Sequence, residues 1–401
     1  MTLLLVIIAL ALGLITYNNP KNGLLVLVAS LPAYLLRTEL LGVPTTLLEL
    51  MGLVFLLAWL LRVRKLPFRD LNNFFGLSLL LIVAAATLSV FVAPNVMAAL
   101  GVWKAFFIEP ILLMLVIREM IFTKQVRVKE LFLALGVSAL VISLVGVIQW
   151  ITGMGIPVPW DIERRITSLF DYPNAVGLFL GPIIVIGTLS VVITKGWERI
   201  FWISASTLSL IAVIAAQSEA ALVALVATFI IAGLTHKKTR IASLAATTIL
   251  ILITTLTPAL FQKLTLHDYS GEVRRSQWTE TAELLKNHWL LGAGLSGYPT
   301  ALAPYHEATE YEIFQYPHNI LLNIWVELGL LGVVAFGLLG FILIQTARQK
   351  PSRAQIIALF VLLEMTIHGL VDVPYFKNDL SLLTWLMIAI TLSTYARPKT
   401  R

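Results

Sequence analysis

The sequence predicts an all-α, polytopic integral membrane protein: a helical bundle of 12 or 13 transmembrane helices with one large extracytoplasmic helical loop. Hydrophobic residues make up 58% of the 401 residues and charged residues only 13%, and the mean hydropathy is +0.89. Soluble domains carry about 25% charged residues, so this composition excludes them. Apolar runs of about 17–25 residues, the length that crosses a bilayer, recur along the whole chain. We therefore expect residues 1–401 to form a single membrane domain.

The apolar runs give the order of the expected helices. Those with the composition of a transmembrane helix lie near residues 1–17, 22–36, 44–61, 74–93, 99–117, 131–151, 173–194, 199–216, 219–235, 241–258, 317–345, 354–371 and 379–396. The first two are short, which leaves a count of 12 or 13 spans. The chain contains no cysteine, so disulfides and thiolate metal sites are excluded.

Basic residues gather in alternate connections between these runs, and this predicts the orientation. Short cytoplasmic loops carry an excess of lysine and arginine. The connections concerned hold Lys21; Arg62, Arg64, Lys65 and Arg69; Arg118, Lys124, Arg127 and Lys129; Lys195 and Arg199; Lys237, Lys238 and Arg240; Arg348, Lys350 and Arg353; and Arg397, Lys399 and Arg401. We expect these loops in the cytoplasm. The net charge of +7 is then a topology signal, and no nucleic-acid partner is predicted.

The extracytoplasmic side receives the polar segments that could carry chemistry. They are residues 152–172, Gln217–Ala220, 259–316 and 372–378. The 259–316 segment is the only long polar stretch, and we expect a helix at about 272–287, a glycine-rich turn at 292–297 and a second short helix near 299–309. Loops of this length are usually functional or disordered rather than simple connectors. We predict that this loop covers an outer cavity open to lipid and forms part of an active site.

Four groups of residues, taken in order, resemble the motifs of a known family. The first is Arg165-Ile-Thr-Ser-Leu-Phe170-Asp-Tyr-Pro173-Asn174, and the second places Arg274 four residues before Trp278. The third is Leu290-Leu291-Gly292-Ala-Gly294, and the fourth joins Pro317-His318-Asn319 to Glu327-Leu-Gly-Leu-Leu-Gly332. Over about residues 150–345 the chain therefore resembles the O-antigen ligase and polymerase family. It departs from the family at Gln217-Ser218-Glu219-Ala220, where members often have Ser-Arg-Gly.

This resemblance implies a glycosyltransferase of lipopolysaccharide or surface polysaccharide biosynthesis. The donor would be a glycan on undecaprenyl diphosphate, and the acceptor a sugar hydroxyl of lipid A-core or of another lipid-linked glycan. The reaction would take place at the outer face of the bacterial inner (plasma) membrane. An O-antigen polymerase and a protein O-oligosaccharyltransferase share the same motifs. A secondary transporter or lipid flippase is the alternative from another class, but the chain shows no repeat of the kind that transporters commonly carry.

The chemistry of the residues supports this activity independently of the resemblance. A guanidinium group can donate two hydrogen bonds to the oxygens of one phosphate. Arg165 and Arg274, with Arg275 as a helper, are therefore predicted to bind the donor diphosphate. Histidine is a suitable base for a hydroxyl, so His318 is predicted to be catalytic. The chain has no Asp-x-Asp sequence, and we predict neither a metal nor a cofactor. The alternatives are solvated or lipid-binding arginines and a helix-capping role for His318.

Further polar residues are candidates to line the substrate cleft. The surrounding membrane lipids are expected as additional partners. They are Lys104, Asn174, Asn319, His368 and Asp372. Charged groups within spans are functional candidates by default; Lys104 and Glu109 share one span but not one helical face. Glu364, His368 and Asp372 recur every four residues, which predicts one helical face. A polar lock, a proton relay and a metal site are all consistent with this second set.

Overall fold

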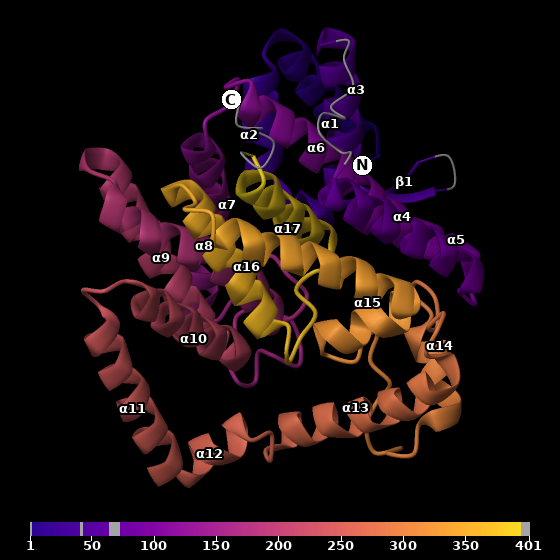
Figure 1. Ribbon diagram of the computed structural model, residues 1–401, viewed down its shortest axis with the longest axis vertical. Coiled ribbons are helices and arrows are strands. Elements are labelled where there is room, and N and C mark those ends of the chain that lie inside the picture. Colours follow the sequence, from indigo (N-terminus) through magenta and orange to yellow (C-terminus); the bar gives the residue numbers. More distant parts are fainter. Residues whose placement is uncertain (1, 41–42, 64–72, 394–401) are drawn as a thin grey trace.

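The computed structural model describes residues 2–40, 43–63 and 73–393. Its α-helices are α1 Thr2–Asn18, α2 Pro20–Ala29, α3 Leu47–Val63, α4 Phe74–Val92, α5 Val96–Val102, α6 Glu109–Phe122, α7 Val128–Thr152, α8 Pro173–Ile193, α9 Gly196–Ala215, α10 Glu219–Thr235, α11 Arg240–Leu256, α12 Pro258–Leu264, α13 Tyr269–His288, α14 Tyr298–Leu302, α15 Ile320–Ala347, α16 Arg353–His368 and α17 Asn378–Thr391 (Figure 1). Two 3-10 helices, η1 Leu31–Leu35 and η3 Ala303–Tyr305, and a π-helical turn, η2 Trp103–Ile108, complete the helical elements. The basic residues Arg64, Lys65, Arg69, Arg397, Lys399 and Arg401 lie outside the described residues.

The predicted fold class, a polytopic helical membrane protein, is confirmed. In the described part of the chain, six helices are long and apolar enough to cross a membrane: Phe74–Val92, Val96–Phe122, Val128–Thr152, Pro173–Ile193, Gly196–Ala215 and Ile320–Ala347. A seventh is counted if Arg240–Leu256 and Pro258–His288, bent by 107°, form one span. Thr2–Asn18, Pro20–Ala29, Glu219–Thr235 and Asn378–Thr391 are shorter apolar helices. The total of 12 or 13 spans stays a prediction.

The N-terminal region differs from the expected run of helices. The stretch expected as a span near 22–36 divides into α2, of 10 residues, and η1. At 1.5 Å per residue α2 reaches about 15 Å, half of a hydrocarbon core of about 30 Å. An antiparallel hairpin follows, in which β1 Arg37–Leu40 pairs with β2 Val43–Thr46. Val43, Thr45 and Thr46 are β-branched and favour a strand, a local signal that the apolar run beginning at residue 44 obscured.

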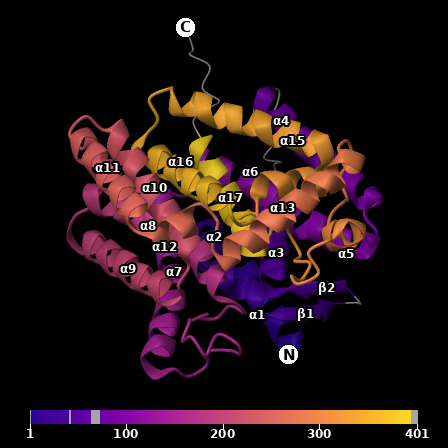
Figure 2. The same ribbon diagram turned by 90° about the horizontal axis from the view of Figure 1, so that it is seen from below.

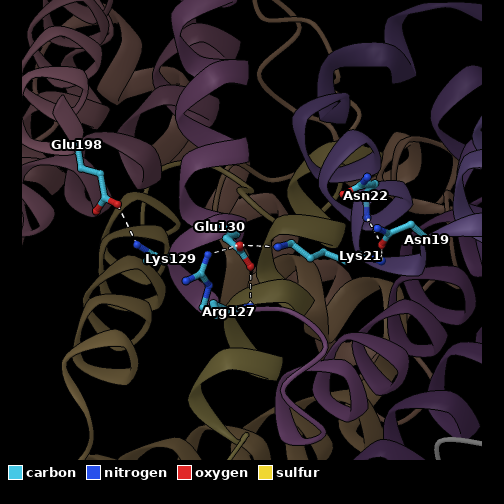
Figure 3. A network of polar contacts seen from close by, with 7 residues as sticks. All are labelled: Asn19, Lys21, Asn22, Arg127, Lys129, Glu130 and Glu198. Carbon is cyan, nitrogen blue, oxygen red and sulfur yellow. Dashed lines mark hydrogen bonds and ion pairs between the residues drawn. The ribbon is translucent and has the colours of Figure 1, made fainter.

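One end of the bundle collects basic residues from separate connections. Lys21 at the start of α2 and Arg127 before α7 both pair with Glu130, at 2.6 and 2.7 Å (Figure 3). Lys129 pairs with Glu198 at the start of α9, at 2.9 Å. The sequence assigned these connections to one side of the membrane, and they do lie together. We call this the basic end.

The other end of the bundle holds the long connections, and we call it the loop end. The Ile166 N–H donates to the Ala215 carbonyl, which joins the 152–172 loop to the end of α9 (3.3 Å). The Ile320 N–H donates to the Gly369 carbonyl, which joins the start of α15 to the loop after α16 (2.7 Å). In Figure 2, α9–α11 form one flank and α4, α5 and α13 the other, with α16 and α17 between them. The loop end therefore gathers segments far apart in the chain.

The 259–316 segment forms a bent strip with α11 along one edge of the molecule (Figure 1). The helix predicted at 272–287 is confirmed as α13, and the glycine-rich turn has positive φ at Gly292 and Gly294. The helix expected near 299–309 is shorter, because α14 and η3 end at Tyr305. The N–H groups of residues 307 and 308 instead donate to the Glu280 carboxylate, both at 3.1 Å. A small apolar core beneath the strip contains Leu284, Leu285, Ala293, Tyr298, Leu302 and Val326.

Candidate functional site

Arg274 and Trp278 lie one turn apart on α13 and hold the two loops that flank the site. The Arg274 Nε donates to the Val371 carbonyl at 3.0 Å. The Trp278 Nε1 donates to the Pro317 carbonyl at 2.8 Å. Residues four apart share one helical face, so the spacing of this motif is the spacing needed to reach both carbonyls. The polar loop helix is thereby fixed against the end of the bundle.

These two contacts bring His318 and Asp372 together. The His318 Nδ1 lies 3.6 Å from the Asp372 Oδ1, and the histidine side chain is 27% exposed whereas the aspartate is 6% exposed. Phe314 packs edge-on against the imidazole, with ring centroids 5.1 Å apart. His318 has φ 47°, a conformation that costs a non-glycine residue about 1–3 kcal/mol and that clusters at functional sites. We call Arg274, Trp278, Pro317, His318, Val371 and Asp372 the junction cluster.

The charge of Asp372 is set by this arrangement. Burial raises the pKa of its carboxyl, but the contact with His318, the charges of His318 and His368, and the Val373 N–H lower it by more, so the pKa lies below its ordinary value. The carboxylate accepts a hydrogen bond from the Val373 N–H at 2.8 Å. An ionised carboxylate beside an imidazole can orient the ring and stabilise its protonated form.

Asn319 has a structural role next to His318. Its side-chain oxygen accepts hydrogen bonds from the N–H groups of Leu321 and Leu322, which makes it the N-cap of α15. Its amide nitrogen donates to the Leu370 carbonyl at 3.0 Å. The helix thus begins two residues after His318 rather than at it, and His318 itself is free of the capping role.

The remaining family-like motifs contact each other through backbone hydrogen bonds. α15 breaks at Gly329, which has φ 65°, and the Leu330 N–H donates to the Leu290 carbonyl at 3.0 Å. The Ala293 N–H donates to the Val326 carbonyl at 2.6 Å. A Cβ at Gly292 would lie 2.2 Å from that carbonyl oxygen, and one at Gly329 would lie 2.4 Å from the Leu290 oxygen. Both glycines are therefore required by close approach of two chain segments.

Glu327 completes this docking. It is fully buried, and its Oε2 accepts a hydrogen bond from the Ser296 N–H at 2.8 Å. The Trp325 Nε1 donates to the Trp289 carbonyl at 2.7 Å. We call Leu290–Ser296 together with Trp325–Leu330 the docking interface.

Arg165 belongs to a different cluster at the loop end. Its Nε donates to the Ala216 carbonyl at 3.3 Å and its Nη2 to the Asn174 Oδ1 at 3.4 Å. Its guanidinium also lies over the Trp160 ring, 5.0 Å from the centroid. Two of the predicted site residues, Arg165 and Asn174, are therefore in contact with each other but not with the junction cluster. Arg275 is exposed on α13, one residue along from the face that holds Arg274.

Lys104, a charged residue within an expected span, has an ion-pair partner that the sequence did not predict. Lys104 lies in the π-helical turn and pairs with Glu49 at 2.5 Å, not with Glu109. Glu49 also accepts a hydrogen bond from the Asn378 Nδ2 at 2.8 Å. Lys104 is thus tied to α3 and to the start of α17, away from the junction cluster.

The predicted face of Glu364, His368 and Asp372 holds only in part. α16 ends at His368, so Asp372 lies in the following loop and turns to His318. The His368 Nδ1 is 3.6 Å from the Glu364 Oε1, and both side chains are buried. His368 is therefore enclosed behind the junction cluster and does not line a cleft at the surface of the described structure.

Lys377 is a candidate that the sequence did not single out. Its Nζ lies 4.7–5.8 Å from the ring centroids of Tyr34, Phe170 and Tyr172 and 3.9 Å from the Asp379 Oδ2. Burial lowers the pKa of this lysine, against the opposing effects of Asp379, Asp372 and Asp171. Cation–π packing of this kind brings together residues that are distant in sequence. No local sequence pattern predicts it.

Glu307, Glu310 and Glu312 form an acidic run in the segment between η3 and α15. Within residues 2–40, 43–63 and 73–393, no group of three or more His, Asp or Glu side chains has the geometry to hold a metal ion. Whether activity is independent of metal stays a prediction.

The fold and the loop end define a polytopic helical membrane protein with a polar cluster where its loop helix meets the bundle. The family model described as O-Antigen ligase matches residues 204–337, which include α13, both halves of the docking interface and His318. The predicted resemblance to the O-antigen ligase family is thereby confirmed over these residues. Comparison with curated proteins finds no match. Over these residues the protein is similar to the O-antigen ligases.

Proposed function

We propose that the protein transfers a glycan from an undecaprenyl-diphosphate donor to a sugar hydroxyl at the extracytoplasmic face of the bacterial inner membrane. The single observation that carries this proposal is the junction cluster, in which His318 faces Asp372 while Arg274 holds the adjoining residue Val371. A base, an orienting carboxylate and a guanidinium group meet where apolar helices end. A lipid-linked, diphosphate-activated sugar needs these groups in that setting.

In this proposal His318 is the general base. With Nδ1 turned to Asp372, Nε2 is the nitrogen available to the acceptor hydroxyl. The separation of 3.6 Å is longer than a hydrogen bond, and catalytic contacts of this kind commonly tighten when substrate binds. Asp372 then acts as a positioning residue that orients the imidazole and stabilises the imidazolium.

The transfer step balances without a cofactor. The acceptor oxygen forms a bond to the anomeric carbon, and its proton passes to Nε2 of His318. The bond between that carbon and the diphosphate oxygen breaks, and its electron pair leaves with the lipid diphosphate. Negative charge therefore grows on the phosphate, where fixed guanidinium groups stabilise the transition state.

Arg274 is the main diphosphate contact in this proposal. Its Nε and Nη1 are held by Val371 and Ser270, and its Nη2 makes no hydrogen bond to another described residue, which leaves that edge for a phosphate oxygen. Arg165, held with Asn174, is proposed as a second contact, and exposed Arg275 as a helper. Arg165 lies in the 152–172 loop and Arg274 on α13, and in this proposal the bound diphosphate contacts both.

The test uses purified protein in lipid nanodiscs with a lipid-linked glycan and a panel of acceptors: lipid A-core, a second lipid-linked glycan and a serine-containing peptide. We expect release of lipid diphosphate and a new glycosidic product, in EDTA as in its absence, and the acceptor that reacts separates ligase, polymerase and protein glycosyltransferase. A product that forms only when Mg²⁺ or Mn²⁺ is restored would overturn the arginine-based mechanism. Movement of intact lipid-linked glycan across vesicles, with no product, would instead indicate a transporter.

A further inference from the structure

A cavity at the basic end has no role in the proposed reaction. It has a volume of about 190 Å³ and lies where α7, α8, α9 and α16 meet. Its lining residues are Lys129, Phe132, Leu133, Ser190, Ile193, Thr194, Glu198, Trp202, Arg353, Ala354 and Ile357. The floor is apolar, whereas the rim carries two basic side chains and one acidic one. The cavity lies at the opposite end of the bundle from the junction cluster.

The rim favours an anion. Arg353 has no ion-pair partner within the part of the chain that the structure describes. Lys129 pairs with Glu198 at 2.9 Å (Figure 3), but the Lys129 side chain is 52% exposed. An exposed pair of this kind contributes little stability, so Lys129 can be shared with a ligand. α7, α9 and α16 all begin here, and the N-terminal end of a helix carries a partial positive charge.

The surroundings indicate a lipid rather than a soluble anion. Val192, Trp197, Ile200 and Ile356 lie within two residues of lining residues on α8, α9 and α16 and are exposed and apolar, as expected for residues that face acyl chains. A tryptophan at this level is typical of the membrane interface. Phe132, Trp202 and Ile357 are buried in the cavity wall and offer an apolar surface to the first carbons of a chain. Basic pockets between transmembrane helices bind anionic lipid headgroups.

We propose that this cavity binds the headgroup of an anionic glycerophospholipid from the leaflet at the basic end. The phosphate lies between Lys129 and Arg353, and one acyl chain leaves across the apolar surface beside α8 and α9. The site is distinct from the proposed donor site and does not depend on the transferase activity.

The experiment is native mass spectrometry of the full chain in a non-ionic detergent, titrated with phosphatidylglycerol or with phosphatidylcholine of the same acyl chains. We expect wild type to bind phosphatidylglycerol in preference. Lys129→Gln and Arg353→Gln should each weaken that binding about fivefold, the factor for one basic side chain near an anionic surface. Arg348→Gln removes an equal charge from an exposed position outside the cavity and should leave the binding unchanged.

Ala354→Trp tests the cavity itself, because it fills the space without changing any charge. We expect it to abolish the preference for phosphatidylglycerol while the melting temperature stays close to that of wild type. Equal binding of both lipids by wild type would overturn the proposal. So would an undiminished preference in Ala354→Trp, since the attraction would then be a diffuse surface effect.

Discussion

Family-like motifs supply most residues of the junction cluster and of the docking interface, yet the two are built in opposite ways. The docking interface is closed: backbone N–H and carbonyl groups meet across it, and Gly292 and Gly329 allow no side chain. The junction cluster is open: His318 is partly exposed and stands off from Asp372 at 3.6 Å. The comparison teaches that one set of residues assembles the loop on the bundle, whereas the other, in the proposed mechanism, presents the reactive groups at the place so formed. Damage to the first should appear as loss of fold, and damage to the second as loss of rate.

The largest effect is expected from Gly329→Ala. A Cβ there would lie 2.4 Å from the Leu290 oxygen, at φ 65°, so steric overlap adds to a conformational cost of about 1–3 kcal/mol. We expect little folded protein on size-exclusion chromatography. Gly337→Ala is the control in the same helix, because nothing lies within 4 Å of its Cβ; it should fold at least as well as wild type. Normal folding of Gly329→Ala would show that the break in α15 is not required.

Arg274→Lys is expected to lose about tenfold to a hundredfold in transfer, close to the loss in Arg274→Ala. A charge-assisted hydrogen bond contributes about 1.5–3 kcal/mol, and an ammonium cannot reproduce the guanidinium fork. Arg275→Lys provides the neighbouring control and should lose much less. The measurement is the initial rate at limiting donor concentration. Equal losses at the two positions would remove the distinction between donor residue and helper.

Trp278→Phe and Trp325→Phe form a matched pair across the two regions. Each tryptophan donates one hydrogen bond to a backbone carbonyl, of Pro317 and Trp289 respectively. Each substitution should lower the free energy of unfolding by about 0.5–1.5 kcal/mol. Only Trp278→Phe should also lower the rate in the folded fraction, because Pro317 adjoins His318. An equal effect of Trp325→Phe on the rate would contradict the proposed difference in role between the docking interface and the junction cluster.

The smallest effect concerns the loop that follows α14. His306 Nδ1 lies 3.1 Å from the Glu280 Oε2, and this contact raises the pKa of the histidine. A raised pKa stabilises the folded loop below the unfolded pKa of histidine, about 6.5, and this stabilisation is lost as pH rises through the folded value. Hydrogen exchange in residues 303–316 should therefore be faster at pH 8.5 than at pH 6 after correction for intrinsic rates. His306→Gln should show no such difference; a loop with pH-independent protection in wild type would contradict the assignment.

The sequence predicted the class of fold from hydropathy, since a membrane requires long apolar helices. It also predicted α13, because Trp278, Ala282 and Leu285 recur at helical spacing within the polar segment. It could not predict the break at Gly329, which is set by the docking of Leu290 and Leu291 against α15, or the size of the 107° bend between α11 and the segment that begins at Pro258. In the candidate site, Arg274 and His318 were found from their motif. Asp372 turns toward His318 because α16 ends at His368, and the groups around Lys377 come from three separate segments. Neither arrangement has a signal in the local sequence.

The central claim is that His318 is the base of a transfer reaction at the junction cluster. It is tested most directly by comparing the rate of lipid diphosphate release in wild type and His318→Gln from pH 6 to 9, with donor binding measured on the same samples. We predict a loss of about 10²–10⁴-fold in rate, the usual contribution of a general base, with donor binding unchanged. A His318→Gln variant that matches the wild-type rate across this range would leave His318 with a structural role only.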